Sequence, residues 1–204
     1  MKGVKLLLCL LGMVLAGYAS AQAKKDFSAF KGASPRSILV VPAINISLNV
    51  DAPSYLLTSL TYPLAEKGYY VFPVNTVKFV LEQEGFYEAE QVHRQPPEAL
   101  AKLFGADAVL YVTIKRWDIA GLILTGTATV KLEYRMVSKD GTEIWRADDM
   151  RQLDVQSNLL TNLLASALKD PITMDHKVLI AMSHAMTFLK GPNPIPNGPY
   201  FKVE

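Results

Sequence analysis

The sequence predicts an α/β fold of the α+β type: a mixed sheet of about five strands, parallel in its first half and an antiparallel meander in its second, with helices packed on both faces. The first observation is the segment Phe104–Trp117, which is apolar at both sets of alternating positions. A strand without a polar face is usually central in a sheet and covered on both sides. The second is a strand–helix–strand pattern over Ile38–Phe72, which predicts parallel neighbours. The third is the alternation along Leu122–Val137, typical of an antiparallel strand with one wetted face.

The amino terminus predicts export. Met1–Lys5 is short and basic, and Leu6–Ala16 is an apolar run of the length found in signal peptides, too short for a stable membrane span. The segment Ala19-Ser20-Ala21 fits the small-x-small rule for signal-peptide cleavage, so residues 1–21 are expected to be removed. The only cysteine, Cys9, lies in this segment, and we therefore expect neither a disulfide nor thiol chemistry in the mature chain.

A second processing signal overlaps the first. Leu15-Ala16-Gly17 begins like a bacterial lipobox, but Tyr18 stands where lipidation requires cysteine. The sequence thus predicts an exported protein, which can carry a lipid anchor only if position 18 is cysteine.

The first half of the domain is expected to alternate strands and helices. Residues 22–36 are predicted to be a flexible tether and Ser37–Pro42 the first strand. Asp51 can cap the next helix, which carries a stripe of buried leucines at Leu56, Leu60 and Leu64 and in which Pro63 should introduce a kink. Tyr69–Pro73 is the expected second strand.

Two further helices are expected before the central strand. Asn75 or Thr76 can cap the first, and Phe86–Gln95 reads as a polar connection. The short helix Glu98–Phe104 should end at Gly105, where a helix C-cap favours positive φ.

The second half is expected to be an antiparallel meander followed by helices. The central strand should turn over Asp118–Leu124, which could make Trp117 and Trp145 cross-strand neighbours. Ser138–Gly141 is a hairpin turn by composition, and Glu143–Val155 is the returning strand.

Two helices, Ser157–Leu168 and Asp175–Leu189, are expected to close the chain. The proline-rich tail 191–204 is expected to be either a strap or disordered. Residues 37–190 are therefore predicted to be a single domain.

Composition excludes one class of partner. The formal net charge is +2, from 21 basic and 19 acidic residues, and loss of Lys2 and Lys5 with the signal peptide makes the mature chain nearly neutral. Nucleic acid binding needs a basic surface, so we expect no nucleic acid partner.

The sequence contains no convincing catalytic, cofactor or metal motif. Ser166-Ala167-Leu168-Lys169 matches the Ser-x-x-Lys of penicillin-recognising enzymes but lacks the accompanying motifs. Among the three histidines, His176 and His184 are eight positions apart, too far to ligate one ion alone. Asp148 and Asp149 are adjacent on a strand and therefore point to opposite faces. We predict no catalytic, cofactor-binding or metal-binding residues.

A candidate partner surface is apolar. Leucines cover more of the helix after Ser157 than one packing face needs, so a core role and a self-association or partner surface both stay open. The candidate residues are Leu159, Leu160, Leu163, Leu164 and Trp117. At the polar end of the central strand, Lys115, Arg116 and Asp118 are candidates for partner contact.

Four segments resemble a known family: Ser34–Pro42, Val50–Pro53, Pro63–Val74 and Leu103–Tyr111, with Gly-Tyr-Tyr-Val-Phe-Pro-Val at 68–74 the most specific. They are similar to a bacterial family of lipoproteins of unknown function, one member of which is a surface-antigen vaccine candidate. The resemblance implies a fold like the amino-terminal domain of TolB and the periplasmic domains of CsgG-like secretion lipoproteins. It also implies a CsgG-like lipoprotein and another small lipoprotein as partners, and no catalytic residues.

Two functional hypotheses follow. The first is a non-enzymatic periplasmic envelope protein, an accessory or assembly component of the outer membrane or secretion machinery that forms a homo-oligomer, a dimer, and works with a CsgG-like lipoprotein. The alternative is a periplasmic binding protein for a small ligand or peptidoglycan fragment, using the loops Ala43–Val50 and Val74–Thr76 after the parallel strands. The family's lipidated cysteine is Tyr18 here, so the chain is either secreted without an anchor or altered to lack one.

Overall fold

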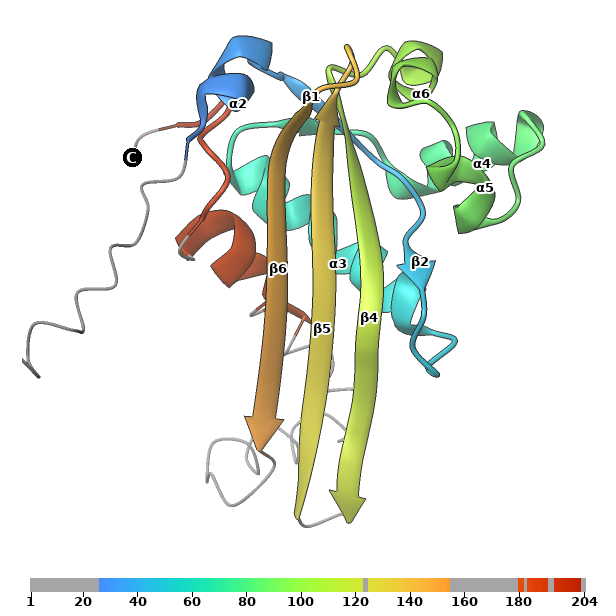
Figure 1. Ribbon diagram of the computed structural model, residues 1–204, viewed down its shortest axis with the longest axis vertical. Coiled ribbons are helices and arrows are strands. Elements are labelled where there is room, and N and C mark those ends of the chain that lie inside the picture. Colours follow the sequence, from blue (N-terminus) through green and yellow to red (C-terminus); the bar gives the residue numbers. More distant parts are fainter. Residues whose placement is uncertain (1–25, 123–124, 155–179, 182, 191–192, 203–204) are drawn as a thin grey trace, which may run out of the picture.

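The computed structural model describes residues 26–122, 125–154, 180–181, 183–190 and 193–202. They form one mixed sheet with strand order β3-β1-β4-β5-β6, to which β2 is added by pairing with β4 (Figure 1). The strands are β1 (Ser37–Val40), β2 (Ile44–Asn45), β3 (Tyr70–Val71), β4 (Ala108–Leu122), β5 (Thr125–Ser138) and β6 (Glu143–Asp154).

Parallel and antiparallel pairing meet at β4. On one side β4 pairs in parallel with β1, which pairs in parallel with β3. On the other side β4 pairs antiparallel with β5, and β5 with β6. The predicted mixed sheet is confirmed, and so is the central place of the strand that begins at Ala108.

The two apolar faces of β4 bury into two separate clusters. Ala108, Leu110, Val112 and Ile114 lie in the larger cluster, at 0% exposure. Val109 and Tyr111 point the other way, into the smaller cluster. Because a strand has a period of two, this double burial requires apolar residues at consecutive positions, as the sequence has them.

Helices cover both faces of the sheet. The helices are α2 (Ser28–Ala33), α3 (Ala52–Glu66), α4 (Val74–Gln83), α5 (Ala89–His93), α6 (Pro97–Phe104) and a π-helical segment η1 (Ala185–Lys190). The leucine stripe of α3 and Phe188 of η1 pack into the larger cluster, behind the sheet in Figure 1. Residues of α4, α5 and α6 pack into the smaller cluster, near the amino-terminal end of β4.

Several helix boundaries differ from those predicted. Helix α3 continues past Pro63 to Glu66, and the side chain of Asp51 makes no capping hydrogen bond. Helix α4 begins at Val74, before the predicted caps, because Pro73 has a φ of −59° that suits entry into a helix. The connection after α4 contains α5, whose start is fixed by Gln91 Oε1 accepting hydrogen bonds from the Tyr87 and Glu88 amides.

A β-bulge changes the second half of β4. The register with β5 shifts between Ile114 and Arg116, so Trp117 is moved onto the face of the larger cluster. The strand then continues to Leu122, and the predicted turn over Asp118–Leu124 is wrong. Trp117 lies opposite Val130, whereas Trp145 lies opposite Met136, so the two tryptophans are not cross-strand neighbours.

Both ends of the described chain pack on the domain. The range predicted as a tether contains α2, whose Phe30 is 3% exposed and packs edge-on against Tyr69. In the tail, Ile195 is fully buried. The Gly198 amide donates to the Lys67 carbonyl and the Tyr200 amide to the Gly68 carbonyl. Residues 193–202 therefore lie as a strap along the end of α3.

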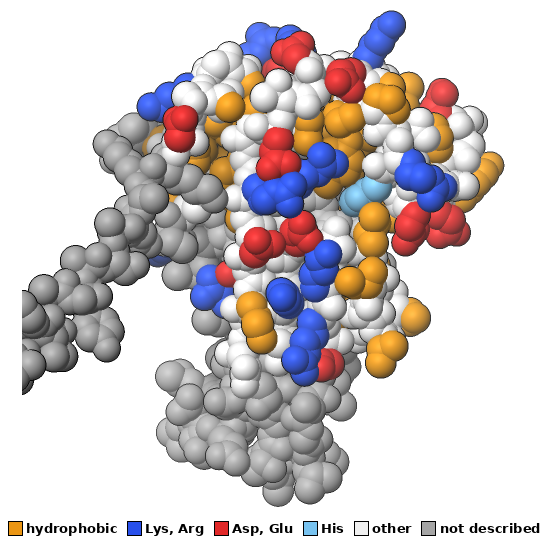
Figure 2. All heavy atoms as spheres, viewed as in Figure 1, with side chains coloured by type: hydrophobic (Ala, Val, Ile, Leu, Met, Phe, Trp, Pro, Cys, Tyr) orange, Lys and Arg blue, Asp and Glu red, His pale blue; other side chains and the backbone are white. Residues whose placement is uncertain are grey.

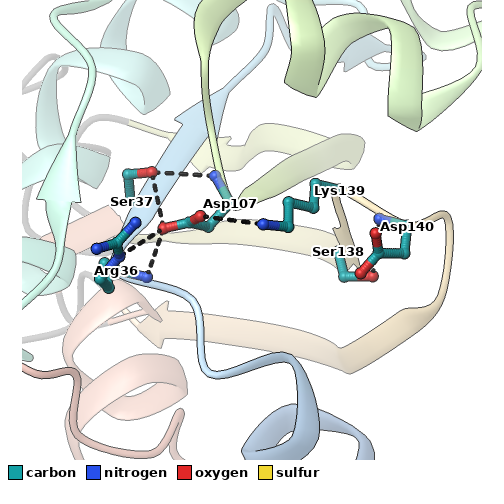
Figure 3. A network of polar contacts seen from close by, with 6 residues as sticks. All are labelled: Arg36, Ser37, Asp107, Ser138, Lys139 and Asp140. Carbon is teal, nitrogen blue, oxygen red and sulfur yellow. Dashed lines mark hydrogen bonds and ion pairs between the residues drawn. The ribbon is translucent and has the colours of Figure 1, made fainter.

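A polar network fastens the parallel end of the sheet (Figure 3). Asp107 Oδ2 accepts hydrogen bonds from the amide and Nε of Arg36, at 3.0 and 3.4 Å, and from Ser37 Oγ. The Asp107 amide in turn donates to Ser37 Oγ at 3.0 Å. From the β5–β6 hairpin, the Lys139 amide donates to the Asp107 carbonyl, and its ammonium lies 3.9 Å from the carboxylate. One carboxylate thus joins the starts of β1 and β4 to the hairpin.

A matched pair of glycine substitutions tests how closely the strap, residues 193–202, packs against the end of α3. Gly68 and Gly85 have φ of +79° and +84°, so alanine strains the backbone equally at both. A Cβ at Gly68 would clash with the backbone of Phe201, whereas a Cβ at Gly85 meets nothing within 4 Å. Urea unfolding should show a loss of about 1 kcal/mol for Gly85→Ala and about 3 kcal/mol or more for Gly68→Ala. Equal losses would contradict the close packing of the strap.

Replacing Asp107 with alanine should lower the free energy of unfolding by about 1–2 kcal/mol at pH 7, because three hydrogen bonds to a charged group are lost. Partial burial alone would raise the Asp107 pKa, but the Arg36 amide and guanidinium together with Lys139 hold it below its ordinary value. The contribution is therefore present above the unfolded pKa of about 3.9 and is lost as pH falls through the native pKa.

Urea unfolding at several pH values measures this, and the difference between Asp107→Ala and wild type should shrink below about pH 4. The control is Asp140→Ala, an exposed carboxylate in the same hairpin, which should unfold at the wild-type midpoint. A difference that persists unchanged into acid would show that the charge of Asp107 is not what stabilises the network.

Candidate functional site

The predicted site residues fall in two groups. Tyr18, Leu159, Leu160, Leu163 and Leu164 lie outside the described residues. Trp117 is only 2% exposed and stacks on Tyr55 of α3, with ring centroids 6.3 Å apart. Trp117 is therefore a core residue rather than a surface residue, because the bulge in β4 turns its side chain inward.

The described part of the chain contains no group of three His, Cys, Asp or Glu side chains that could hold a metal ion. His93 Nε2 lies 2.9 Å from the Pro42 carbonyl and its ring packs edge-on against Tyr111. His176 lies outside the described residues. None of the helices that the structure describes is long and apolar enough to span a membrane.

A cluster of polar side chains under β5 and β6 connects these strands to the segment before η1. Asp149 is 8% exposed, accepts a hydrogen bond from Ser183 Oγ at 2.6 Å and pairs with Arg151 through two contacts of 2.6 and 3.0 Å. The Tyr134 hydroxyl lies 3.4 Å from Ser183 Oγ, and burial raises the pKa of Tyr134. The carboxylate thus joins β6 to the segment that leads into η1, and burial closes it to a substrate.

His184 lies beside this cluster, fully buried against the rings of Tyr134 and Phe188. Burial lowers its pKa to about 4, so the imidazole is neutral at pH 7. No substrate could reach it without local opening of the fold. It contributes to packing rather than to acid–base chemistry.

A hollow of about 210 Å³ lies at the carboxyl ends of the parallel strands β1 and β3. We call it the α3–α4 groove, because its walls come mainly from the start of α3 and from α4. The walls are mostly apolar, and they include Val40, Pro42, Leu57, Val77, Leu81 and Phe86. One of the two predicted ligand loops, Val74–Thr76, contributes Val74, whereas the other, Ala43–Val50, contributes no lining residue.

The polar groups of the α3–α4 groove are few. Lys78, Glu82 and Glu88 supply charge, and Ser54 supplies a hydroxyl. Lys78 and Glu82 lie 3.8 Å apart, one turn of α4 from each other. Binding pockets for organic ligands usually measure about 300–1,000 Å³ and are mostly apolar with a few polar groups. The groove has this kind of lining but is smaller.

Next to this groove the chain exposes three aliphatic side chains. Ile46, Leu48 and Val50 are 61%, 100% and 86% exposed, and we call them the aliphatic tip. The loop is ordered by hydrogen bonds of Asn45, whose amide donates to the Asn49 carbonyl and whose oxygen accepts from Ser47. Sequence reasoning missed this feature, although apolar residues alternate with polar ones across 46–50 and could have indicated it. Hydrophobic side chains are visible along this edge of the molecule in Figure 2.

The second exposed feature is the charged face of β4–β6, turned toward the viewer in Figure 2. Glu133 at its centre pairs with Lys115 at 2.8 Å and with Arg146 at 3.1 Å. Arg116 pairs with Asp118 at 2.9 Å. We call the face formed by Lys115, Arg116, Asp118, Lys131, Glu133 and Arg146 the charged sheet face.

The structure thus brings the three residues predicted for partner contact, Lys115, Arg116 and Asp118, onto one exposed surface. Arg116 and Asp118 are 52% and 44% exposed at their side chains. Rigid strands hold these charges at fixed spacing, which suits recognition of a protein surface rather than chemistry on a small substrate.

Residues 25–194 match the family model described as "Putative lipoprotein GNA1162-like". The chain is 36% identical over 183 residues to the "Putative lipoprotein NMB1124/NMB1162" of Neisseria meningitidis serogroup B, covering 82% of this chain and 85% of that protein. It is also similar to the crystal structure of lipoprotein GNA1162 from Neisseria meningitidis, with a TM-score of 0.57, 37% identity, and coverage of 69% of this chain and 99% of that one.

These relatives are lipoproteins of unknown function, which implies a bacterial envelope location. The match spans most of the chain, including the mixed sheet, the α3–α4 groove and the charged sheet face. The chain therefore belongs to the GNA1162-like family of lipoproteins.

Proposed function

We propose that the protein is a non-enzymatic component of the bacterial envelope that acts by docking other proteins, as an accessory or assembly factor in the periplasm at the outer membrane. The observation that carries this proposal is the charged sheet face. It is exposed, rigid and rich in paired charges. The carboxylates of the two polar clusters, Asp107 and Asp149, are largely buried and bound to neighbouring basic or hydroxyl groups.

The arrangement of charge favours a protein partner. The ion pairs run across strands, from Lys115 on β4 through Glu133 on β5 to Arg146 on β6. Exposed pairs of this kind contribute little to stability. They can instead set the orientation and rate of association with a surface of complementary potential.

The partner we propose is a CsgG-like lipoprotein, together with a second small lipoprotein. This proposal follows from the resemblance of the sequence to a family whose members are thought to work beside such proteins. The same resemblance implies a fold related to the TolB amino-terminal domain and to CsgG-like periplasmic domains. The leucines at 159, 160, 163 and 164 are proposed as an additional apolar contact for the partner. In this proposal residues 1–21 are the signal peptide and residues 37–190 the docking domain.

The alternative, a binding protein for a small ligand or peptidoglycan fragment, would use the α3–α4 groove. Its volume of about 210 Å³ is below the range usual for organic ligands, which counts against this alternative. Saturable binding of a peptidoglycan fragment, abolished by filling the groove, would favour this alternative over docking.

Charge reversal on the sheet face tests the docking proposal. Lys115→Glu combined with Arg116→Glu should lower capture of the purified CsgG-like lipoprotein by about tenfold or more, because like charges then oppose the partner. The measurement is surface-immobilised binding at two salt concentrations, and wild-type capture should weaken as salt rises.

The control is Lys102→Glu combined with Lys78→Glu, two exposed lysines on α6 and α4 outside the charged sheet face, which changes the net charge by the same amount. Equal loss with the control would point to net charge rather than to this surface. If wild-type protein captures neither the CsgG-like lipoprotein nor another envelope protein, the docking function is wrong.

Restoring the cysteine at position 18 tests the proposed envelope location. Tyr18→Cys should move the protein from the soluble periplasmic fraction to the outer-membrane fraction, because the completed lipobox would be acylated. Mass spectrometry of the amino terminus detects the lipid, and Tyr18→Ser should stay soluble. A soluble, unacylated Tyr18→Cys product would rule out lipoprotein processing at this site.

A further inference from the structure

We propose that the charged sheet face binds a surface of a different protein that is built from β-strands and whose side chains alternate acid, base, acid along the strand direction. This assignment rests on the proposed docking function and deepens it by naming the charge pattern of the partner. The order of the charges on β4, β5 and β6 carries it, rather than their number.

Charges of the same sign lie directly opposite each other on neighbouring strands of this face. In order along the sheet, the like-charged pairs are Arg135 with Arg146, Glu133 with Asp148, and Arg116 with Lys131. The first two pairs join β5 to β6, and the third joins β4 to β5. The face therefore carries a first basic row, an acidic row and a second basic row, each of which runs across the strands.

All three rows point away from the larger cluster. Leu132 and Tyr134, which lie between the charged residues of β5, are buried in that cluster, so the alternation of the strand turns the charges to the opposite face. Lys131, Arg146 and Asp148 are exposed. Figure 2 shows acidic side chains between basic side chains above and below them, over the long strands.

The rows do not favour the stability of the free protein. Like charges directly opposite each other on neighbouring strands repel. Ion pairs offset part of this repulsion, since Glu133 lies 3.1 Å from Arg146 and Arg116 lies 2.9 Å from Asp118. Lys131 forms no ion pair with another residue in the described part of the chain. The second basic row thus keeps a positive charge that an acidic group of a partner can neutralise.

The spacing of the rows indicates the architecture of the partner. On β5 the rows are represented by Lys131, Glu133 and Arg135, which stand two residues apart, a distance of about 6.8 Å in a strand. A partner strand that lies along β5 repeats its own same-face side chains at this distance. A helix repeats them every four residues, at about 6 Å and in a single file, so it would lose register and meet only part of each row. Two neighbouring partner strands match all three rows.

The acidic row is incompatible with a partner of uniform charge. A nucleic acid or an anionic membrane surface presents negative charge opposite every row, so Glu133 and Asp148 would repel it. A uniformly basic surface would be repelled by the two basic rows. An alternating surface is attracted at each row and repelled when it shifts by one row, which fixes the register of the contact.

Two disulfide-cyclised β-hairpin peptides of identical composition test the pattern on the wild-type protein. One presents successive rows of Glu, Lys and Glu across both of its strands, and the other presents rows of Glu, Glu and Lys. The alternating hairpin should bind at least about tenfold more tightly in calorimetric titration at low salt, and the difference should shrink as salt screens the charges. Because the two peptides have equal net charge, only the order of the charges can separate them.

Exchanging two charges on β5 tests the same rows from the side of the protein. Lys131→Glu combined with Glu133→Lys keeps the net charge and should weaken binding of the alternating hairpin by about tenfold or more, because two rows then meet like charge. The matched control is Lys78→Glu combined with Glu82→Lys, which exchanges an exposed ion pair on α4 and should bind as wild type does. Circular dichroism and the urea midpoint verify that both variants fold.

The outcomes separate the charge pattern from the docking function. Equal affinity for the two hairpins, or binding of neither, would overturn the pattern, whereas the docking function would still stand or fall with capture of an envelope protein. An exchanged variant that binds the alternating hairpin as tightly as wild type does would overturn the pattern too. A change in sedimentation coefficient caused by the exchange would show that a second copy of the chain occupies the face, and would overturn the assignment to a different protein.

Discussion

The burial of β4 on both faces is the constraint on which the rest of the structure depends. Its first five residues alternate between two apolar clusters, and each fully buried aliphatic side chain contributes roughly 1.5–3 kcal/mol. A strand in this position must have a neighbour on each edge and a helix layer on each face. β1 and β5 supply the edges, α3 and η1 cover one face, and α4–α6 cover the start of the other.

The same strand joins two kinds of pairing, and the polar network of Asp107 stands where they meet. Asp107, just before β4, holds the start of β1 through its carboxylate and the β5–β6 hairpin through its backbone carbonyl and an ion pair with Lys139. The helices over the smaller cluster cover only the start of β4. The strands β4, β5 and β6 are longer than this cover, with total lengths of 15, 14 and 12 residues. The length of the strands beyond their cover is what creates the charged sheet face.

Two exposed surfaces of the described residues could contact other proteins. The charged sheet face offers orientation and salt-dependent attraction, whereas the tip and groove offer apolar burial. These two surfaces differ in the kind of contact that they can make with another protein. Both surfaces are built on ordered elements, so neither needs a large rearrangement to bind.

Local patterning in the sequence determined the fold class, the central strand, the parallel strand–helix–strand unit and the hairpin at 138–141, because these depend on periodicity and on glycine at turns. Family membership also rests on short motifs, such as residues 68–74. Only the tertiary structure decided that Trp117 is buried, because one extra residue near Lys115 inverts the alternation of side chains between the two faces of β4. No residue type in the sequence predicts such a bulge. It also decided that Ile46, Leu48 and Val50 stay outside while Leu56 goes inside, because exposure depends on which neighbours fold over a loop, and composition does not encode those neighbours.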